Sequence, residues 1–208
     1  MSLFLAPIHE WLFNKIIILE NIEKEIVKEF ESDELLKYHS ELCEKFGDYI
    51  PNKPLEELID QSNIHGWLQN RITVAESRQA ALVKELTLEG DNAEKIRSVY
   101  YSEGKRIAEI TEKKFSTPAE VFNELSNILL EGMPCDRVNR ILESDDNNMI
   151  WEISQCVHKA NWESSGVDVE YYYTFRESFI KGFVENISDD FGYLYNNGEV
   201  QMSKIFRK

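Results

Sequence analysis

Apolar residues recur at three- and four-residue steps along the first half of the chain. One stripe covers residues 8–30 and a second covers residues 64–86, and each predicts a long amphipathic helix. Each stripe is followed by a further segment with helical spacing, over 33–50 and 92–115. Several residues are suited to begin these helices, namely Pro7, Ser32, Asn63 and, after the break at Gly90, Asp91. We therefore expect the first half of the protein to be helical.

The two long stripes belong to an internal repeat. Residues 8–16 read IHEWLFNKI and residues 64–72 read IHGWLQNRI. Without a gap, 10 of 23 aligned positions are identical. The repeat predicts two helical hairpins, residues 8–48 and 64–110, that arose by duplication and pack as a four-helix bundle.

The hydrophobic pattern changes after the segment Ser116-Thr117-Pro118. Residues 118–131 predict a helix that Thr117 caps and Pro118 opens. Residues 168–187 predict another helix, with Asp168 as its cap and aromatic residues along one face. Both segments are flanked by residues with a different pattern.

Two stretches of the second half have the character of β-structure. Asn197-Gly198 predicts a hairpin. Residues 137–157 fit a β-hairpin or a short helix, and we favour the hairpin. The predicted fold class is mainly α. Duplicated helical hairpins form a four-helix bundle over residues 1–115, followed by a smaller α+β region with antiparallel hairpins over residues 116–208.

Charge narrows the range of partners. The sequence has 38 acidic and 23 basic side chains, a formal net charge of −15. Such a surface repels phosphate backbones and anionic membranes, so we expect no nucleic acid and no membrane as a partner. The 3 cysteines are too few for a disulfide framework, and no signal peptide is recognisable, so we expect a cytoplasmic protein. A small-molecule ligand and a homodimer are both open.

His9 and His65 are the first candidate site residues. They occupy the same position in the two copies of the repeat and are expected at the same end of the bundle. There they could bind a divalent transition metal or polarise a ligand. The simpler explanation is that each packs, half-buried, beside its neighbours. Packing alone would accept an apolar residue, so a histidine in both copies favours a polar role.

Glu20 and Glu76 are a second repeated pair. Each follows its histidine on the same helix face, but about 16 Å further along the axis, so a histidine and a glutamate of one helix cannot share a metal. The two glutamates could form a carboxylate layer with Glu41 and Glu103, as in di-metal bundles. The alternative is that they are ordinary solvated glutamates.

Cys135, Cys156 and His158 form a third candidate site. On a strand, Cys156 and His158 would face the same side, and Cys135 could oppose them across a hairpin. With Glu152 this arrangement predicts a mixed metal site, or a thiolate activated by histidine. Buried cysteines that act as small hydrophobic residues are the simpler explanation.

Trp151 and Tyr172 belong to an aromatic-rich part of the second half. They could line a pocket for a flat or apolar ligand, or be ordinary core residues. The strand–Cys–helix–hairpin order of this half resembles that of small ligand-binding domains of the 4-vinyl reductase type. The resemblance lies in the order of elements, so it identifies no site residue.

These patterns predict a protein that binds a small molecule or a metal between its two regions, as an enzyme or a sensor. One alternative is a non-catalytic interaction or structural protein. The other is a metalloenzyme that uses the His9/His65 pair. No motif indicates a particular substrate or reaction.

Overall fold

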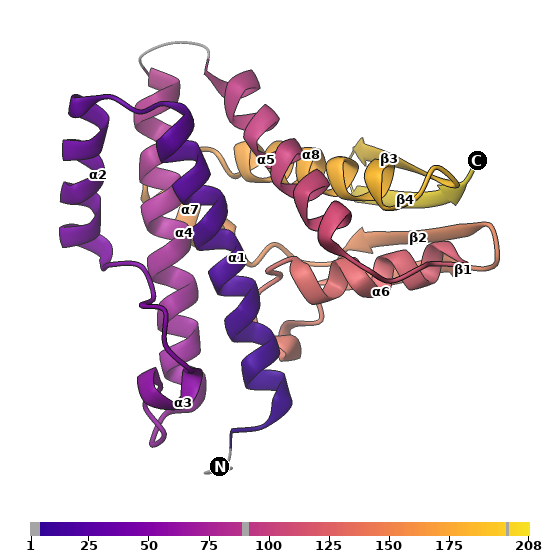
Figure 1. The fold of residues 1–208 in the computed structure, drawn as a ribbon, viewed down its shortest axis with the longest axis horizontal. Helices are drawn as coiled ribbons and strands as arrows, with labels where there is room; N and C mark the ends of the chain where they lie inside the picture. Colours follow the sequence, from indigo (N-terminus) through magenta and orange to yellow (C-terminus); the bar gives the residue numbers. More distant parts are fainter. Residues whose placement is uncertain (1–4, 89–91, 199) are drawn as a thin grey trace.

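The described part of the chain is mainly helical and includes a four-stranded antiparallel sheet (Figure 1). The computed structural model describes residues 5–88, 92–198 and 200–208. In chain order the elements are α1 (Pro7–Glu29), α2 (Asp33–Phe46), α3 (Leu55–Leu58), α4 (Ile64–Leu88), α5 (Ala93–Ile110), α6 (Pro118–Ile128), the 3-10 turn η1 (Pro134–Asp136), β1 (Asn139–Ser144), β2 (Asn148–Ile153), α7 (Lys159–Ser164), α8 (Val169–Ile187), β3 (Phe191–Asn197) and β4 (Gln201–Arg207).

The two repeat helices, α1 and α4, lie side by side and run in the same direction (Figure 1). Their N-terminal turns meet, and further along both helices Glu23 contacts Arg78. Pro7 opens α1, and the side chain of Asn63 accepts the backbone N–H of Gly66 at the start of α4. The helices predicted over residues 8–30 and 64–86 are thus confirmed, although α1 begins and ends one residue earlier and α4 ends two residues later.

Helix α5 does not complete a four-helix bundle with its neighbours. It packs mainly along α8, where two glycines allow the backbones to touch. A Cβ atom on Gly104 would collide with the carbonyl oxygen of Phe179, and one on Gly182 would collide with that of Tyr101. The predicted four-helix bundle is therefore not confirmed, and the duplication stays a prediction. The proposed cap of α5, Asp91, lies outside the described residues.

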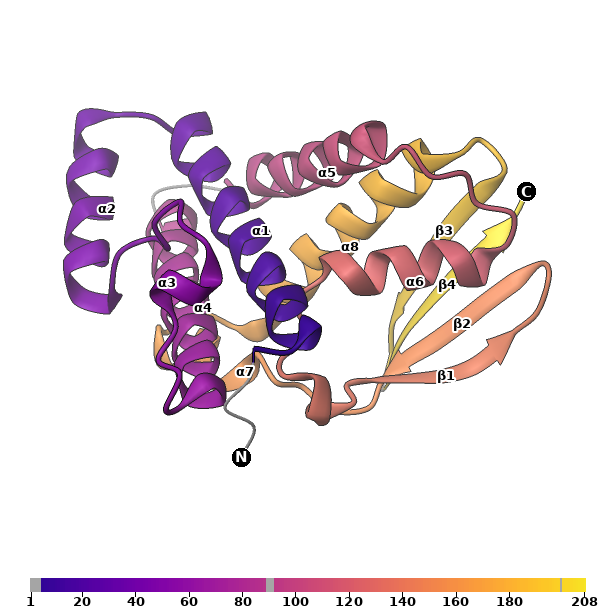
Figure 2. The same cartoon turned by 60° about the horizontal axis from the view of Figure 1, so that its bottom comes forward.

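Both hairpins predicted for the second half are present in one sheet, whose strand order is β1-β2-β4-β3. All three pairings are antiparallel; Ile141 faces Trp151 between β1 and β2, and Asn197 faces Gln201 between β3 and β4. Helices α6 and α8 pack against the sheet (Figure 2). The residues 137–157 therefore contain strands rather than a helix, apart from their ends.

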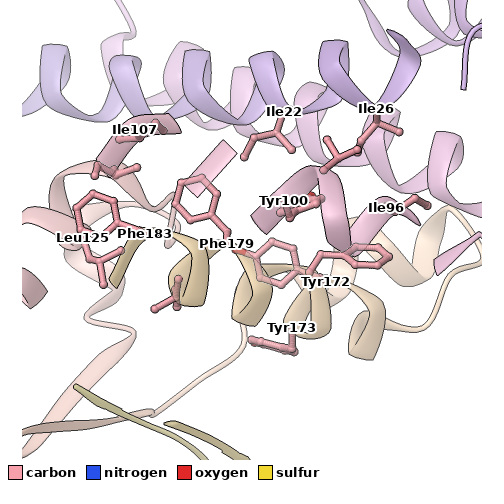
Figure 3. Close-up of a cluster of buried hydrophobic side chains, with 14 of the residues drawn as sticks. Ile22, Ile26, Ile96, Tyr100, Ile107, Leu125, Tyr172, Tyr173, Phe179 and Phe183 are labelled. Carbon is pink, nitrogen blue, oxygen red and sulfur yellow. The ribbon is translucent and has the colours of Figure 1, made fainter. Parts of the chain in front are cut away.

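The main hydrophobic core draws residues from both halves of the chain. Ile22 and Ile26 of α1 lie over Tyr100 of α5, and Phe179 and Phe183 of α8 continue the same cluster (Figure 3). A second, smaller cluster lies between α1, α3 and α4. Because α5 belongs to the first cluster, the predicted boundary at residue 116 passes through a shared core. None of the helices in the described ranges combines the length and apolar character that a membrane crossing needs.

Candidate functional site

Figure 2 shows α1, α6 and the β1–β2 hairpin coming together. Side chains from these elements line a cleft. It has a volume of about 210 Å³. Two tryptophans, Trp11 of α1 and Trp151 of β2, form part of its walls, and α6 contributes apolar side chains such as Phe122. Its charged lining residues are Lys15, Glu131, Arg137 and Arg176. The cleft therefore joins apolar walls to a cluster of charges.

Lys15 is the buried cation of this cleft. Its side chain is only 4% exposed, and its Nζ atom lies 3.3 Å from the centre of the Trp11 ring. Trp11 is itself held by α6, because its Nε1 donates to Oδ1 of Asn127 at 2.9 Å. Within the described ranges Nζ has no hydrogen-bond acceptor. Burial lowers the pKa of Lys15 to about 7, although the nearby carboxylate of Glu131 acts in the opposite direction.

Glu131, just after α6, is tied to Arg176 of α8. Nε of Arg176 donates to Oε1 of Glu131 at 2.6 Å, and Nη2 lies 2.5 Å from the same oxygen. Burial alone would raise the pKa of Glu131, but Arg176 and then His158 lower it to about 2. Glu131 is therefore ionised at neutral pH.

A buried row of charges extends from this pair into the protein. Nδ1 of His158 lies 2.8 Å from Oε1 of Glu76, and its Nε2 lies 3.9 Å from Oε2 of Glu131. Burial lowers the pKa of His158, but Glu76 and Glu131 raise it to about 9. The side chain is thus an imidazolium at neutral pH. The alternation of charges from Glu76 to Arg176 holds Glu131 in place at the edge of the cleft.

The backbone beside the cleft contains an unusual conformation. Arg137 follows the 3-10 turn η1 with a φ of 51°, in the left-handed region that residues other than glycine rarely adopt. Such conformations cost about 1–3 kcal/mol and are frequent at functional sites. This conformation places an exposed arginine at the cleft.

A second, smaller cavity lies behind the first. Its volume is about 30 Å³, and most of its walls are apolar side chains of α1, α5 and α8. Lys15 and Arg176 line both cavities, and Tyr172 lines the second. Tyr172 stacks on His158 with ring centres 3.9 Å apart, and its hydroxyl donates to the carbonyl oxygen of Leu130. Tyr172, a predicted site residue, thus supports the buried row of charges.

The structure brings the predicted pair His9 and His65 together. Their Nε2 atoms lie 3.2 Å apart where α1 and α4 begin. His9 is buried and His65 is exposed. Burial, followed by the charge of His65, lowers the pKa of His9. The pair is separate from the cleft, because neither histidine lines it.

Glu20 and Glu76 are not brought together. Glu20 accepts from the backbone N–H of Ile50 at 2.8 Å and from Arg71 at 3.1 Å. Glu76 instead pairs with His158 on the other side of α4. Of their predicted partners, Glu103 pairs with Arg106 and Glu41 is exposed. The expected carboxylate layer is therefore not formed, because each glutamate has a different cationic partner.

The buried partner of Glu20 and Glu23 is Arg78 of α4. Its side chain has no exposed surface, and its Nε donates to Oε1 of Glu23 at 2.8 Å. Its Nη1 donates to the carbonyl oxygen of Gly47, and its guanidinium lies over the Tyr49 ring. This network joins α1, α4 and the loop after α2, and is structural.

Cys135 and Cys156 do not share a site with His158. Strand β2 ends at Ile153, so Cys156 lies in the following loop, and both cysteines are exposed. His158 turns inward to Glu76. Over residues 5–88, 92–198 and 200–208, no group of three or more potential metal-ligating side chains is found.

Trp151, which the sequence left open between a pocket wall and the core, lines the cleft and also belongs to the main hydrophobic core. The sequence did not identify the four charged lining residues, Lys15, Glu131, Arg137 and Arg176. A signal was present for Lys15, which lies between Leu12 and Leu19 on the buried face of α1. Arg176 likewise follows buried Phe175 on a helix rich in aromatic residues. In both cases, a charged residue within an apolar helix face indicated the site.

No family model matches the sequence, and neither the curated proteins nor the solved structures contain a significant match.

Proposed function

We propose that this protein binds a small organic anion in the cleft between α1, α6 and the β1–β2 hairpin. The observation that carries the proposal is Lys15, whose side chain is 4% exposed and lines the cleft, and whose amine contacts the Trp11 ring but forms no ion pair or hydrogen bond with the described residues. Burying a charge without a carboxylate partner is costly. A bound anion would provide both an opposite charge and an acceptor.

The charges around the cleft favour an anion over a cation. Lys15, Arg137 and Arg176 line it, and the carboxylate of Glu131 is already paired with Arg176. Two cationic groups therefore remain without a carboxylate partner in the cleft. The cleft is therefore locally positive, although the whole chain has a net charge of −15. Large polyanions are repelled by the whole surface, whereas a small anion meets only the local field.

The walls and the size of the cleft favour an organic ligand. Trp11, Trp151 and Phe122 offer apolar surface, and the indole Nε1 of Trp151 finds no acceptor within the described ranges. A volume of about 210 Å³ is below the usual range for drug-sized ligands. A small carboxylate with a short apolar part fits these walls.

Binding can be tested with simple probes. We expect pyruvate, lactate or benzoate to raise the melting temperature, and calorimetry to show one site per chain. Lys15→Met should lose this binding, whereas Lys159→Met, the same change at a side chain that is 61% exposed, should keep it. A non-catalytic interaction protein would show no stabilisation by any probe. That result, or equal binding by Lys15→Met, would overturn the proposal.

The His9/His65 pair supports a second candidate, a transition-metal site. Two Nε2 atoms 3.2 Å apart can be spanned by one metal ion with bonds of about 2.0–2.1 Å, once His9 carries its hydrogen on Nδ1 and gives up the bond from the backbone N–H of Ala6. The remaining ligands would be water or substrate. This candidate involves a different part of the molecule and can be tested independently.

A further inference from the structure

Lys15 has surroundings that suit a nucleophile. Its amine is held against the Trp11 ring, in a site where no carboxylate of the described residues forms an ion pair with it. It lies at the junction of the cleft and the small apolar cavity behind it. A ligand in the cleft would therefore meet the amine directly.

The comparison with the repeat partner of Lys15 supports this point. Arg71 occupies the aligned position in α4, and its guanidinium donates to Glu20 and to the carbonyl oxygen of Asp48. Lys15 has no such partner, although Glu131 lies near enough to affect it electrostatically. Arg71 is thus used for structure, whereas the amine of Lys15 contacts the Trp11 ring and lines the cleft without an ion pair among the described residues.

A lysine amine attacks a carbonyl group only in its neutral form. Burial keeps the pKa of Lys15 near 7, so a large share of the amine is neutral at physiological pH. An exposed lysine is almost fully protonated under the same conditions. Lys15 is therefore more reactive toward carbonyl groups than the surface lysines.

We propose that Lys15 forms a reversible imine with the carbonyl group of a small oxo acid whose carboxylate faces the arginines of the cleft. This inference rests on the proposed function and names the class of ligand. A 2-oxo acid carries the two groups that the cleft requires, an anion for Arg137 or Arg176 and an electrophilic carbon for the amine.

The reaction is balanced without an oxidant or a reductant. The Nζ lone pair bonds to the carbonyl carbon, and one of the two Nζ protons passes through water to the carbonyl oxygen to give a neutral carbinolamine. Nζ then loses a proton and the hydroxyl group leaves as water, which forms the C=N bond. Glu131 lines the cleft but stays ionised beside Arg176 and His158, so water rather than Glu131 carries the protons in these steps.

The test is reductive trapping of the full-length chain. Pyruvate and sodium cyanoborohydride should add one reduced adduct per chain, and peptide mapping should place it at Lys15. Lys15→Arg keeps the charge but lacks the nucleophile, so its adduct should fall to background, whereas Lys159→Arg should react like the wild type. The rate of trapping should rise with pH through about 7.

Lactate separates this inference from the proposed function, because it has the carboxylate but no carbonyl group. If pyruvate and lactate both bind and pyruvate is not trapped at Lys15, the imine is wrong and anion binding stands. If neither binds, the proposed function fails as well. Adducts spread evenly over the surface lysines would also overturn the inference.

Discussion

The Nε2 atoms of His9 and His65 lie 3.2 Å apart, although the residues are 56 positions apart in the chain. Nδ1 of His9 accepts the backbone N–H of Ala6 at 3.0 Å, so a neutral His9 carries its hydrogen on Nε2 and donates it to His65. This hydrogen bond joins the first turns of the two repeat helices. It gives the histidine of each repeat copy a polar role, because His9 donates this hydrogen bond and His65 accepts it.

We expect His65→Leu to lower the free energy of unfolding by about 1 kcal/mol, because the His9 donor loses its acceptor. His65→Gln keeps an acceptor and should cost less. Urea denaturation measures both.

A zinc titration of the wild type and His65→Leu tests the metal candidate. Binding of one equivalent that His65→Leu abolishes would support it, and absence of binding would contradict it.

Arg78→Met should lower the free energy of unfolding by about 3–5 kcal/mol, because Glu20 and Glu23 would keep their charges in the interior without this guanidinium. Arg97→Met is the matched control. Arg97 is 37% exposed and pairs with Glu94, which is 76% exposed, and with Glu177, which is 20% exposed, so its loss should cost about 0–1 kcal/mol. Similar losses in the two variants, measured by urea denaturation, would show that the buried network contributes little.

Lys15→Met should stabilise the protein most at low pH. Lys15 has a folded-state pKa of about 7, below its usual 10.5, so the unfolded chain binds more protons between these values. Wild-type stability from this group therefore rises with pH across that window, by up to about 1.4 kcal/mol per unit. The difference in the free energy of unfolding between Lys15→Met and the wild type should therefore decrease as the pH rises. Denaturation at pH 6 and pH 9, with Lys159→Met as control, measures the difference, and a constant advantage would contradict the prediction.

His158 should have the opposite dependence on pH. Its pKa is raised from 6.5 to about 9 in the folded protein, so its contribution is complete below pH 6.5 and is lost as pH rises through 9. His158→Gln cannot be protonated, and it should therefore be most destabilised relative to the wild type at pH 6. An equal destabilisation at pH 6 and pH 9 would show that His158 is neutral in the fold.

Gly104→Ala should destabilise the protein by about 1–3 kcal/mol, because a methyl group there forces α5 away from the backbone of α8. Gly198→Ala is the control, since a Cβ atom there would lie 3.5 Å from Oδ1 of Asn196, an ordinary contact distance. Thermal unfolding of both variants tests whether the close contact sets the position of α5.

The sequence predicted helices more reliably than it predicted their partners. The stripe from Ile8 to Phe30 is a local property, so α1 could be located without knowledge of the rest of the fold. The choice of α8 as the partner of α5 depends on a surface match around Gly104 and Gly182, which periodicity does not encode. Periodicity therefore offered no reason to prefer α8 over the other predicted hairpin as the partner of α5, and the prediction that the two hairpins pack on each other was not confirmed.

The candidate site shows the same limit. His9 and His65 could be placed together because the repeat related them. Lys15 could not, because a lysine inside an apolar stripe interrupts the pattern by which core positions are found. The cysteine site failed for a local reason, since the strand ends at Ile153 and no longer fixes the direction of Cys156.

The contact between α5 and α8 also determines when the chain can fold. Tyr101 donates a hydrogen bond to Glu185, which leaves the ribosome 84 residues later. During that interval the face of α5 that contains Tyr101 and Gly104 lacks its cover from α8. Until α8 is synthesised, we expect the first half to expose this face, the kind of surface that makes incomplete chains prone to aggregate.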